Sequence, residues 1–276
     1  MVNKTLGLIA GMGELPNAVA MSAKSKGYKV IAIALDSLAS DKLKDFADVV
    51  RIINVGSFSL ILRTLNEFQV TDLVLVGKVP KTLLYNGKLK LDLKAISMLF
   101  RLRNRKDDTI LLSITNEIER NGIRCRDITD FTEDMLTPEG NITKQKLTKT
   151  HLKDIQFGFQ IAKQMGKLDI GQTVVVKNQA VIAVEAIEGT DRAIKRAGEL
   201  TEGSVVVKVS KPKQDRRFDF PVVGLNTIET MKEAHSDLLA LEAYNTLMIQ
   251  KDEMIKEAVK HKIRIFGVNE NNIINR

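Results

Sequence analysis

The chain has 276 residues, 44% hydrophobic and 28% charged, a balance typical of a globular protein with a buried core that excludes a disordered or fibrous chain. The single cysteine, Cys125, excludes an internal disulfide and suits a reducing cytoplasm, and no apolar run approaches the ~18 residues of a membrane span. The net charge of +8 favours a partner that carries phosphate, and the aromatic fraction of only 5% argues against single-stranded nucleic acid, whose bases stack on aromatic side chains. The alternative is that the surplus lysines only keep the surface solvated.

Strands and helices alternate along the first half of the chain. The predicted strands are Thr5–Ala10, Lys29–Leu35, Asp72–Val76 and Ile123–Asp127, and the predicted helices are Pro16–Lys26, Ser57–Phe68 and Asp108–Asn121. This alternation predicts a parallel sheet covered on both faces, and therefore a Rossmann-like N-terminal domain over residues 1–133.

A basic amphipathic stretch, residues 91–108, interrupts this pattern. Its apolar residues, placed on one predicted helical face, are Leu93, Ile96, Leu99 and Phe100, and its cations are Lys94, Arg101, Arg103, Arg105 and Lys106. Such a helix can lie on an anionic membrane surface. The alternative is an ordinary surface helix that packs one side on the core.

Residues 134–150 contain Pro138 and Gly140 and show no clean period, so we expect a linker there. Residues 151–276 predict a second α/β domain, with a mixed sheet, that holds the catalytic residues. Its predicted elements are a helix over Asp154–Met165, strands over Thr173–Lys177 and Ala180–Glu185, a helix over Asp191–Leu200 with Thr190 as N-cap, a strand over Ser204–Val209, helices over Glu229–Leu239 and Lys251–Lys260, and a strand over Ile263–Val268.

Two turns at the ends of N-terminal strands are candidate phosphate contacts. Gly11, Met12 and Gly13 stand between a strand and a helix, where backbone N–H groups can face an anion. The dinucleotide fingerprint is incomplete, because Pro16 replaces its third glycine, although Asp36 stands where a ribose-binding acid would. Gly77 and Lys78 end another strand, and an exposed loop lysine is the alternative there. A tight turn without a ligand is the alternative for the glycines.

The C-terminal half carries two polar segments at strand ends. Residues 185–191 place Glu188, Thr190 and Asp191 at a turn, which suits Mg²⁺ or sugar hydroxyls, or simply caps the next helix. Residues 208–221 predict a loop that contains two prolines, in which lysines and arginines that can neutralise phosphate are interleaved with aspartates. The alternative is a solvated loop in which the arginines and aspartates only form salt bridges with one another. The three histidines match no zinc spacing. If a metal acts here, we expect a hard cation held by carboxylates, with Mg²⁺ as the default.

Five segments carry a resemblance to a known family. They are LGLIAGMGELP (6–16), KDDT (106–109), DIGQ (169–172), EAIEGTD (185–191) and KPKQDRRFDFP (211–221). In order and spacing the sequence resembles the UDP-2,3-diacylglucosamine diphosphatases of the LpxI type. The resemblance implies two domains that hold a lipid product between them, and Mg²⁺-dependent hydrolysis to UMP and 2,3-diacylglucosamine 1-phosphate (lipid X), a step toward lipid A. The family's Arg-x-Asp-x-Pro motif implies that Asp219, between Arg217 and Pro221, is the essential aspartate, while Lys213 departs from an expected small residue.

The residues and the resemblance together predict a diphosphate hydrolase. We expect Asp219, Asp215 and Glu188 to hold Mg²⁺, with Asp219 catalytic. The expected substrate contacts are Gly11, Met12, Gly13, Gly77, Lys78, Thr190, Asp191, Lys211, Gln214 and Arg217. The expected partners are a UDP-activated diacylated glucosamine and, for a cytoplasmic protein, the surface of the inner membrane, with no nucleic acid. The alternatives are a nicotinamide-dependent oxidoreductase and a non-catalytic binder of anionic lipid or nucleic acid.

Overall fold

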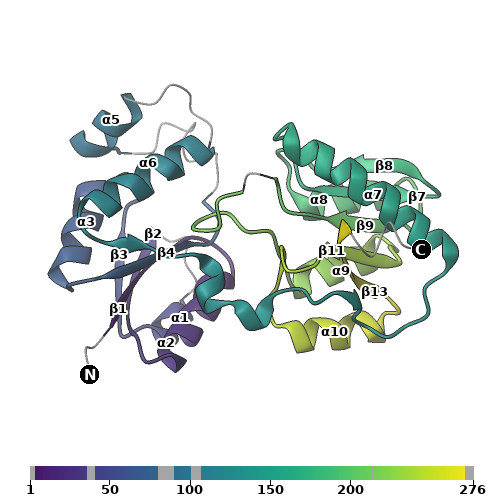
Figure 1. The fold of residues 1–276 in the computed structure, drawn as a ribbon, viewed down its shortest axis with the longest axis horizontal. Helices are drawn as coiled ribbons and strands as arrows, with labels where there is room; N and C mark the ends of the chain where they lie inside the picture. Colours follow the sequence, from purple (N-terminus) through teal and green to yellow (C-terminus); the bar gives the residue numbers. More distant parts are fainter. Residues whose placement is uncertain (1–3, 36–40, 80–89, 101–106, 213, 271–276) are drawn as a thin grey trace. The chain divides into compact units, whose positions relative to one another are not determined.

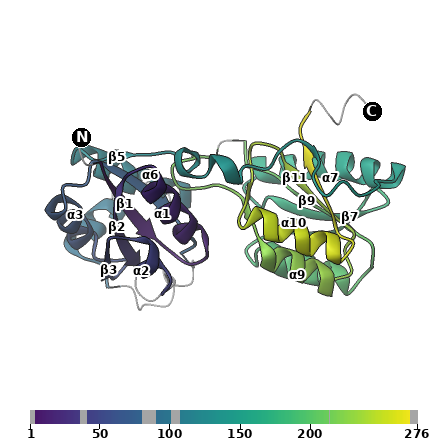
Figure 2. The same ribbon diagram turned by 90° about the horizontal axis from the view of Figure 1, so that it is seen from below.

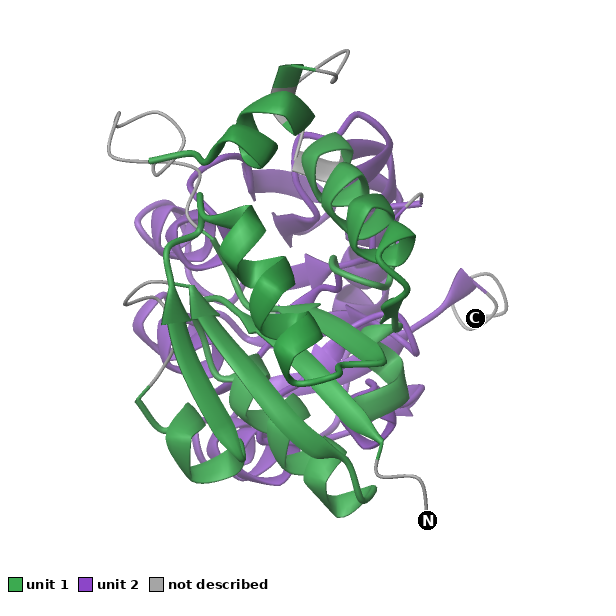
Figure 3. Ribbon diagram, turned by 90° about the vertical axis from the view of Figure 1, so that its left-hand side faces the viewer, with its two compact units in different colours: residues 1–132, 215–219 green, residues 133–214, 220–276 purple. Residues whose placement is uncertain are grey.

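The computed structural model describes residues 4–35, 41–79, 90–100, 107–212 and 214–270. The chain divides into two compact units (Figure 3). Unit 1 comprises Met1–Thr132 and Asp215–Asp219, and unit 2 comprises Glu133–Gln214 and Phe220–Arg276. The expected linker, residues 134–150, falls within unit 2, and a short segment of the C-terminal half falls within unit 1.

Unit 1 is built on a parallel sheet, as predicted. Its strands are β1 (Thr5–Ala10), β2 (Lys29–Leu35), β3 (Val49–Ile53), β4 (Asp72–Val76) and β5 (Arg124–Cys125). They lie in the order β3-β2-β1-β4-β5, and every neighbouring pair is parallel. Strand β3 was not predicted, because this edge strand is largely exposed and lacks the buried apolar run of its neighbours.

Helices cover both faces of this sheet (Figure 1). They are α1 (Leu15–Ser25), α2 (Leu43–Phe46), α3 (Phe58–Glu67), α5 (Leu93–Phe100) and α6 (Asp107–Arg120), with a 3₁₀ turn η2 (Ile128–Phe131). Helices α1 and α2 lie on one face, and α3 and α6 on the other. In α3 the spacing of Phe58, Ile61, Leu62 and Leu65 makes one apolar stripe, and all four are buried in the core of unit 1.

The basic stretch, residues 91–108, was predicted as one helix, and the structure differs from that prediction. Helix α5 covers Leu93–Phe100 and α6 begins at Asp107, with residues 101–106 outside the described part of the chain. Ala95 and Met98 face the core of unit 1. Leu93 and Phe100, assigned to the same predicted face as Ile96, are instead exposed. The apolar residues of α5 therefore occupy two sides of the helix.

Unit 2 contains the expected mixed sheet. Its strands are β6 (Gly140–Asn141), β7 (Thr173–Lys177), β8 (Ala180–Val184), β9 (Val205–Lys208), β11 (Leu238–Glu242) and β13 (Arg264–Val268), in the order β6-β13-β11-β9-β7-β8. The three central strands β13, β11 and β9 are parallel, whereas β6, β7 and β8 join by antiparallel pairing. A separate parallel pair joins β10 (Val222–Val223) to β12 (Leu247–Met248).

The helices of unit 2 divide between two faces of the sheet (Figures 1 and 2). The elements are α7 (Lys149–Lys167), α8 (Thr190–Gly198), α9 (Leu225–Glu233) and α10 (Lys251–Lys260), with a 3₁₀ turn η3 (Glu133–Met135). Helix α7 packs on one apolar cluster of the sheet, and α8, α9 and α10 pack on another. Among the described residues, no helix is both long and apolar enough to cross a membrane.

One predicted helix is wrong. The helix expected over Glu229–Leu239 ends at Glu233, and Leu238–Glu242 forms the central strand β11. Leucine, alanine and glutamate favour helices by intrinsic propensity, which misled the sequence prediction. Here the segment pairs with β9 and β13 and is buried throughout, so tertiary pairing overrides local preference.

Candidate functional site

The two predicted phosphate turns of unit 1 lie side by side at the carboxyl ends of β1 and β4. The N–H of Met12 donates to the carbonyl of Lys78 and the N–H of Lys78 donates to that of Met12, both at 2.9 Å. Gly77 has a φ of 91°, and a Cβ on Gly11 would lie 2.8 Å from the Lys78 carbonyl oxygen. Glycine is therefore required where the turns meet, at the sheet edge where open parallel sheets bind ligands.

A buried amide at the start of α1 was missed by sequence reasoning. The Asn17 side chain donates to a Glu14 carboxylate oxygen at 3.0 Å, but its own Oδ1 has no hydrogen-bond partner among the described residues. Buried acceptors normally have a hydrogen-bond donor, so this oxygen can accept a hydrogen bond from a ligand or a water molecule. No sequence motif identifies Asn17, because its burial depends on the tertiary structure.

The loop that carries the predicted catalytic aspartate is a part of unit 1. The N–H of Ile128 donates to the Arg216 carbonyl at 3.0 Å, and Phe218 packs against the core of unit 1. The Arg217 guanidinium lies 2.7 Å from an Asp215 oxygen and 3.2 Å from a Glu119 oxygen. These contacts attach residues 215–219 to an element that precedes them by about a hundred residues.

Asp215 and Arg217 hold each other in the charged state. The guanidinium of Arg217 lowers the pKa of the Asp215 carboxyl, and hydrogen bonding to Asp215 raises the pKa of Arg217. Both oxygens of Asp215 accept hydrogen bonds from Arg217, one also from its backbone N–H at 3.0 Å. A metal ion bound by Asp215, or a phosphate bound by Arg217, would therefore bind a side chain that already takes part in the Asp215–Arg217 ion pair.

Asp219 lies in the same turn as Asp215. Its N–H donates to the Asp215 carbonyl at 2.9 Å, and its side chain is half-buried. The third predicted metal ligand, Glu188, belongs to unit 2, where its carboxylate accepts from Arg196 at 2.8 Å. Backbone hydrogen bonding and then Arg196 lower the Glu188 pKa. Within the described part of the chain, no three acidic, histidine or cysteine side chains converge as a metal cluster.

In unit 2, a buried polar network occupies the edge where β9 ends. Lys208 donates from Nζ to the Thr190 hydroxyl at 2.9 Å and to the Val222 carbonyl at 3.0 Å. Thr190 in turn donates to the Glu185 carboxylate at 2.9 Å. Thr190 is therefore not the N-cap that the sequence predicted. Gly189 takes that place with a φ of 87°, and the threonine hydroxyl serves the network instead.

A buried ion pair holds the start of the loop that follows β9. Lys163 on α7 lies 2.9 Å from a carboxylate oxygen of Glu242, the last residue of β11. Glu242 accepts from the Ser210 N–H at 2.8 Å, while Lys163 donates to the Ser210 carbonyl at 3.2 Å. The two side chains therefore hydrogen-bond to both the N–H and the carbonyl group of Ser210. Sequence reasoning missed it, because the partners lie 79 residues apart.

Beyond Ser210 the loop contains two of the predicted substrate contacts. Lys211 pairs with Asp169 at 2.7 Å, and its N–H donates to the Gln214 amide oxygen at 2.9 Å. The Nε2 of Gln214 and the Oε1 of Gln172 are buried without a partner among the described residues. These two unsatisfied amide atoms of unit 2 are places where a polar ligand group can bind.

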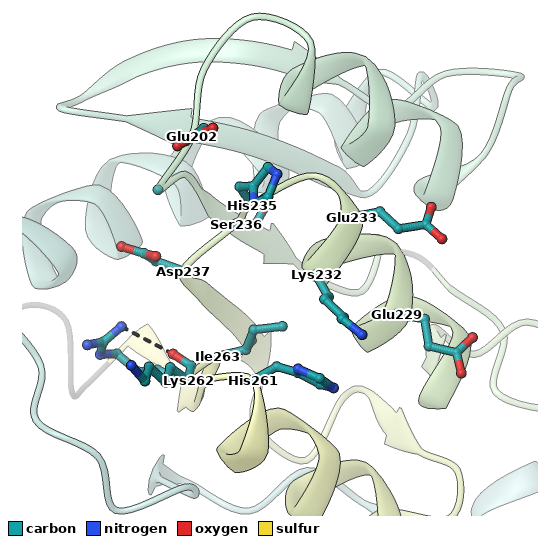
Figure 4. Close-up of a pocket in the computed structure, with 12 residues that line it drawn as sticks. Glu202, Glu229, Lys232, Glu233, His235, Ser236, Asp237, His261, Lys262 and Ile263 are labelled. Atoms are coloured by element: carbon teal, nitrogen blue, oxygen red, sulfur yellow. Dashed lines mark hydrogen bonds between the residues drawn. The ribbon is translucent and has the colours of Figure 1, made fainter.

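A pocket in unit 2 lies elsewhere (Figure 4). This pocket of about 1110 Å³ is lined in part by residues at the amino ends of β11 and β13: His235 and Asp237 precede β11, and Arg264 begins β13. It therefore opens at the amino ends of the parallel strands, where such sheets rarely bind ligands. None of the predicted site residues lines it.

Two family models together account for nearly the whole chain. The LpxI N-terminal domain matches residues 5–135, and the LpxI C-terminal domain matches residues 138–266. The chain belongs to the LpxI family. A curated LpxI relative from Caulobacter vibrioides, named UDP-2,3-diacylglucosamine pyrophosphatase LpxI, is 29% identical over 280 residues, which cover 96% of this chain and 98% of the relative.

Two solved structures have a distant likeness to this LpxI chain. A biotin carboxylase from Campylobacter jejuni is 11% identical with a TM-score of 0.30, over 71% of this chain and 41% of that one. An N5-carboxyaminoimidazole ribonucleotide synthetase with ADP is 13% identical with a TM-score of 0.29, over 63% of this chain and 32% of that one. The chain thus spans less than half of either protein, and the likeness carries no argument about function.

The predicted site residues of this LpxI chain fall into three groups. The two phosphate turns contain Gly11, Met12, Gly13, Gly77 and Lys78, the loop within unit 1 contains Asp215, Arg217 and Asp219, and unit 2 contains Glu188, Thr190, Asp191, Lys211 and Gln214. In the third group Asp191 accepts from the Asn226 amide at 2.7 Å, beside the N-terminus of α8. Asp36, the ribose-binding candidate of the oxidoreductase alternative, lies outside the described residues.

Proposed function

We propose that this protein hydrolyses the diphosphate of UDP-2,3-diacylglucosamine to UMP and 2,3-diacylglucosamine 1-phosphate, a step toward lipid A. The observation that carries the proposal is the match of both LpxI domains across the chain, with a relative of that name aligned over 96% of it. The protein then acts in the cytoplasm at the inner-membrane surface, because its substrate carries two acyl chains.

The turns of unit 1 suit the nucleotide or sugar phosphate. A parallel sheet of order β3-β2-β1-β4-β5 is the arrangement of Rossmann-like domains, which bind phosphate at the turn after the first strand. Here Gly11–Gly13 and Lys78 lie at that turn, and the free oxygen of Asn17 can accept from a sugar hydroxyl. These features support a nucleotide-binding role for this edge.

Mg²⁺ is the proposed metal, held by Asp219 with help from Asp215 or Glu188. Carboxylate oxygens are the ligands that Mg²⁺ prefers, and it is commonly held by one or two carboxylates together with substrate phosphates and water. The two aspartates of one turn fit that requirement without a third protein ligand. When bound, the metal would neutralise charge on the diphosphate oxygens.

The protein's own groups then position and stabilise the reacting diphosphate. Arg217 provides a cation that Asp215 holds in place, and Lys211 provides a cation that Asp169 holds in place. A water oxygen bonds to the phosphorus nearest the sugar, and the bond from that phosphorus to the bridging oxygen breaks, so that UMP leaves with this oxygen. A phosphate monoester is stable as an anion, so the reaction needs no strong general acid.

Replacement of Asp219 tests the mechanism. Asp219→Ala is expected to lower kcat by roughly 10²-fold or more, as the loss of one major electrostatic group does. The assay measures UMP released from UDP-2,3-diacylglucosamine with Mg²⁺ or with EDTA. Asp252→Ala, at an exposed position in the first turn of α10, is the matched control and should keep normal turnover.

Two outcomes would overturn the proposal. Normal turnover of Asp219→Ala would remove Asp219 from the mechanism, and UMP release that is unaffected by EDTA would remove the metal. Hydrolysis in ¹⁸O-labelled water provides an independent check, because attack at the sugar phosphorus places the label in the sugar 1-phosphate. Label in UMP instead would contradict the proposed direction of attack.

A further inference from the structure

Lys208, the last residue of β9, is a buried cation that the proposed mechanism does not use. It is only 6% exposed, and its Nζ donates to the Thr190 hydroxyl at 2.9 Å and to the Val222 carbonyl at 3.0 Å. Burial of an ammonium group is costly unless hydrogen bonds compensate for the lost hydration. The groups that provide this compensation therefore indicate what the cation holds together.

One of these hydrogen bonds joins the two ends of the loop that carries the predicted catalytic aspartate. Lys208 ends β9, where the loop begins, and Val222 starts β10, where the loop ends. Thirteen residues separate the two positions. The predicted site residues among them are Lys211, Gln214, Asp215, Arg217 and Asp219. The contact of Nζ with the Val222 carbonyl thus closes the stem of the whole loop.

The pairing of β10 explains why the Val222 carbonyl can accept from Lys208. The carbonyls on either side of it, those of Pro221 and Val223, accept N–H groups of β12 and of the residue after β12, both at 2.9 Å. Successive carbonyls of a strand point to opposite sides, so the Val222 carbonyl faces away from β12. Strands β10 and β12 form a two-stranded sheet separate from the six-stranded sheet that contains β9. The Lys208 side chain therefore links two sheets that share no strand.

The same ammonium holds the turn before α8, which carries the other polar motif of unit 2. The Thr190 hydroxyl accepts from Lys208 and donates to the buried carboxylate of Glu185 at 2.9 Å. Because the hydroxyl is used in both directions, its orientation is fixed. Residues 185–191 contain the predicted site residues Glu188, Thr190 and Asp191. Lys208 is thus a point at which this turn and the loop after β9 are joined.

We propose that Lys208 is a positioning residue of the candidate active site, which holds the turn at 185–191 and the stem of the loop after β9 in one arrangement. The proposal rests on the proposed function, because the two joined segments carry the predicted metal ligands. Displacement of reacting groups by about 1 Å can lower a rate by roughly 10²-fold, so loss of the joint should be measurable in kcat.

The start of the loop has a second support, which defines what Lys208 adds. Glu242 and Lys163 hydrogen-bond to both backbone groups of Ser210. The beginning of the loop therefore does not depend on Lys208 alone. The specific contribution of Lys208 is to hold the end of the loop at Val222 and to fix it against Thr190.

Lys208→Met in the full-length protein tests the proposal, because methionine keeps much of the side-chain length but donates no hydrogen bond. We expect kcat for UMP release from UDP-2,3-diacylglucosamine to fall by roughly 10- to 100-fold, with KM changed by less than about threefold. Lys177→Met is the matched control and should keep normal turnover. Lys177 ends β7 at the opposite edge of the same sheet and also donates to a threonine hydroxyl and a backbone carbonyl, those of Thr201 and Glu202.

A double-mutant cycle tests whether Lys208 acts through Thr190. Thr190→Val keeps the shape of the side chain and removes its hydroxyl. If the two residues form one joint, the double variant should lose no more kcat than the more impaired single variant. Losses that multiply in the double variant would show independent actions and would overturn the proposal.

Hydrogen exchange without substrate provides a readout that general destabilisation would not reproduce. In Lys208→Met the amides of residues 185–191 and 222–224 should exchange about tenfold faster or more, while those of β11 and β13 stay as protected as in the unsubstituted protein. Thr190→Val should show the same local pattern, so the measurement does not depend on the folding of one variant. A uniform increase throughout unit 2 would indicate a merely structural role and would overturn the proposal.

The activity results separate the possible roles of Lys208. Normal kcat in Lys208→Met would overturn the proposal, and a KM raised more than about tenfold at unchanged kcat would identify Lys208 as a substrate contact instead. Failure of the proposed function has a different signature, since the unsubstituted protein would then release no UMP with Mg²⁺. The exchange pattern would still confirm or refute the joint between the two segments.

Discussion

Glu242 offers a sharp test of how unit 2 holds the loop that follows β9. Its carboxylate lies 2.9 Å from Lys163 Nζ and accepts the Ser210 N–H at 2.8 Å, and the two charged side chains are only 10% and 19% exposed. Glu242→Ala therefore leaves a nearly buried ammonium and a backbone N–H without their partner. Loss of one member of a buried pair costs about 3–5 kcal/mol of unfolding free energy.

The expected effect is a lower melting temperature for unit 2. For a domain of this size about 1 kcal/mol shifts Tm by roughly 3 °C, so Glu242→Ala should lower the Tm of unit 2 by about 10 °C. Circular dichroism measures the transition. Replacement of both partners by methionine removes the charges together and should restore the stability lost through the unpaired ammonium, because an apolar pair of similar volume is often neutral or stabilising, whereas the Ser210 N–H still lacks its acceptor.

Two results would refute this reasoning. A change of less than about 1 kcal/mol in Glu242→Ala would mean that the pair is solvated and contributes as little as a surface ion pair. A double-methionine variant that is as unstable as Glu242→Ala would mean that packing, and not charge, is responsible. Glu242→Gln, which keeps the acceptor for Ser210 but lacks the charge, should lie between the single alanine variant and the unsubstituted protein.

Three further predictions concern single side chains. Burial raises the pKa of the Cys125 thiol to about 12, so alkylation at pH 8 should be slow in the folded protein and should accelerate when unit 1 unfolds; fast labelling without unfolding would contradict this. Burial lowers the pKa of His151 below the 6.5 of the unfolded chain, so the unfolded state gains a proton first and stability should fall as pH drops below about 6.5. His151→Asn should flatten that part of the curve of unfolding free energy against pH, and an unchanged slope would exclude His151 as its cause. Glu188→Gln should raise the Mg²⁺ concentration needed for half-maximal UMP release if Glu188 binds the metal. An unchanged requirement would leave it as the partner of Arg196 alone.

Local sequence patterns were sufficient for much of the fold. The apolar stripe of α3 and the short apolar runs of β1, β2 and β4 predicted a covered parallel sheet, because their periodicity reports burial directly. The glycines at 11 and 77 predicted two tight turns, which glycine alone permits. The family motifs predicted membership of the LpxI family, which both domain matches confirm.

Only the tertiary structure decided the remaining features. Leu238–Glu242 has the composition of a helix but pairs as a central strand, because β9 and β13 hydrogen-bond to its two edges and the apolar clusters on either side of the sheet bury its two faces. Arg217 contacts Glu119, and Lys163 contacts Glu242, through folding that brings distant segments together. Periodicity describes one element at a time, so it predicts which side chains share a face but not which face meets another element and which meets solvent.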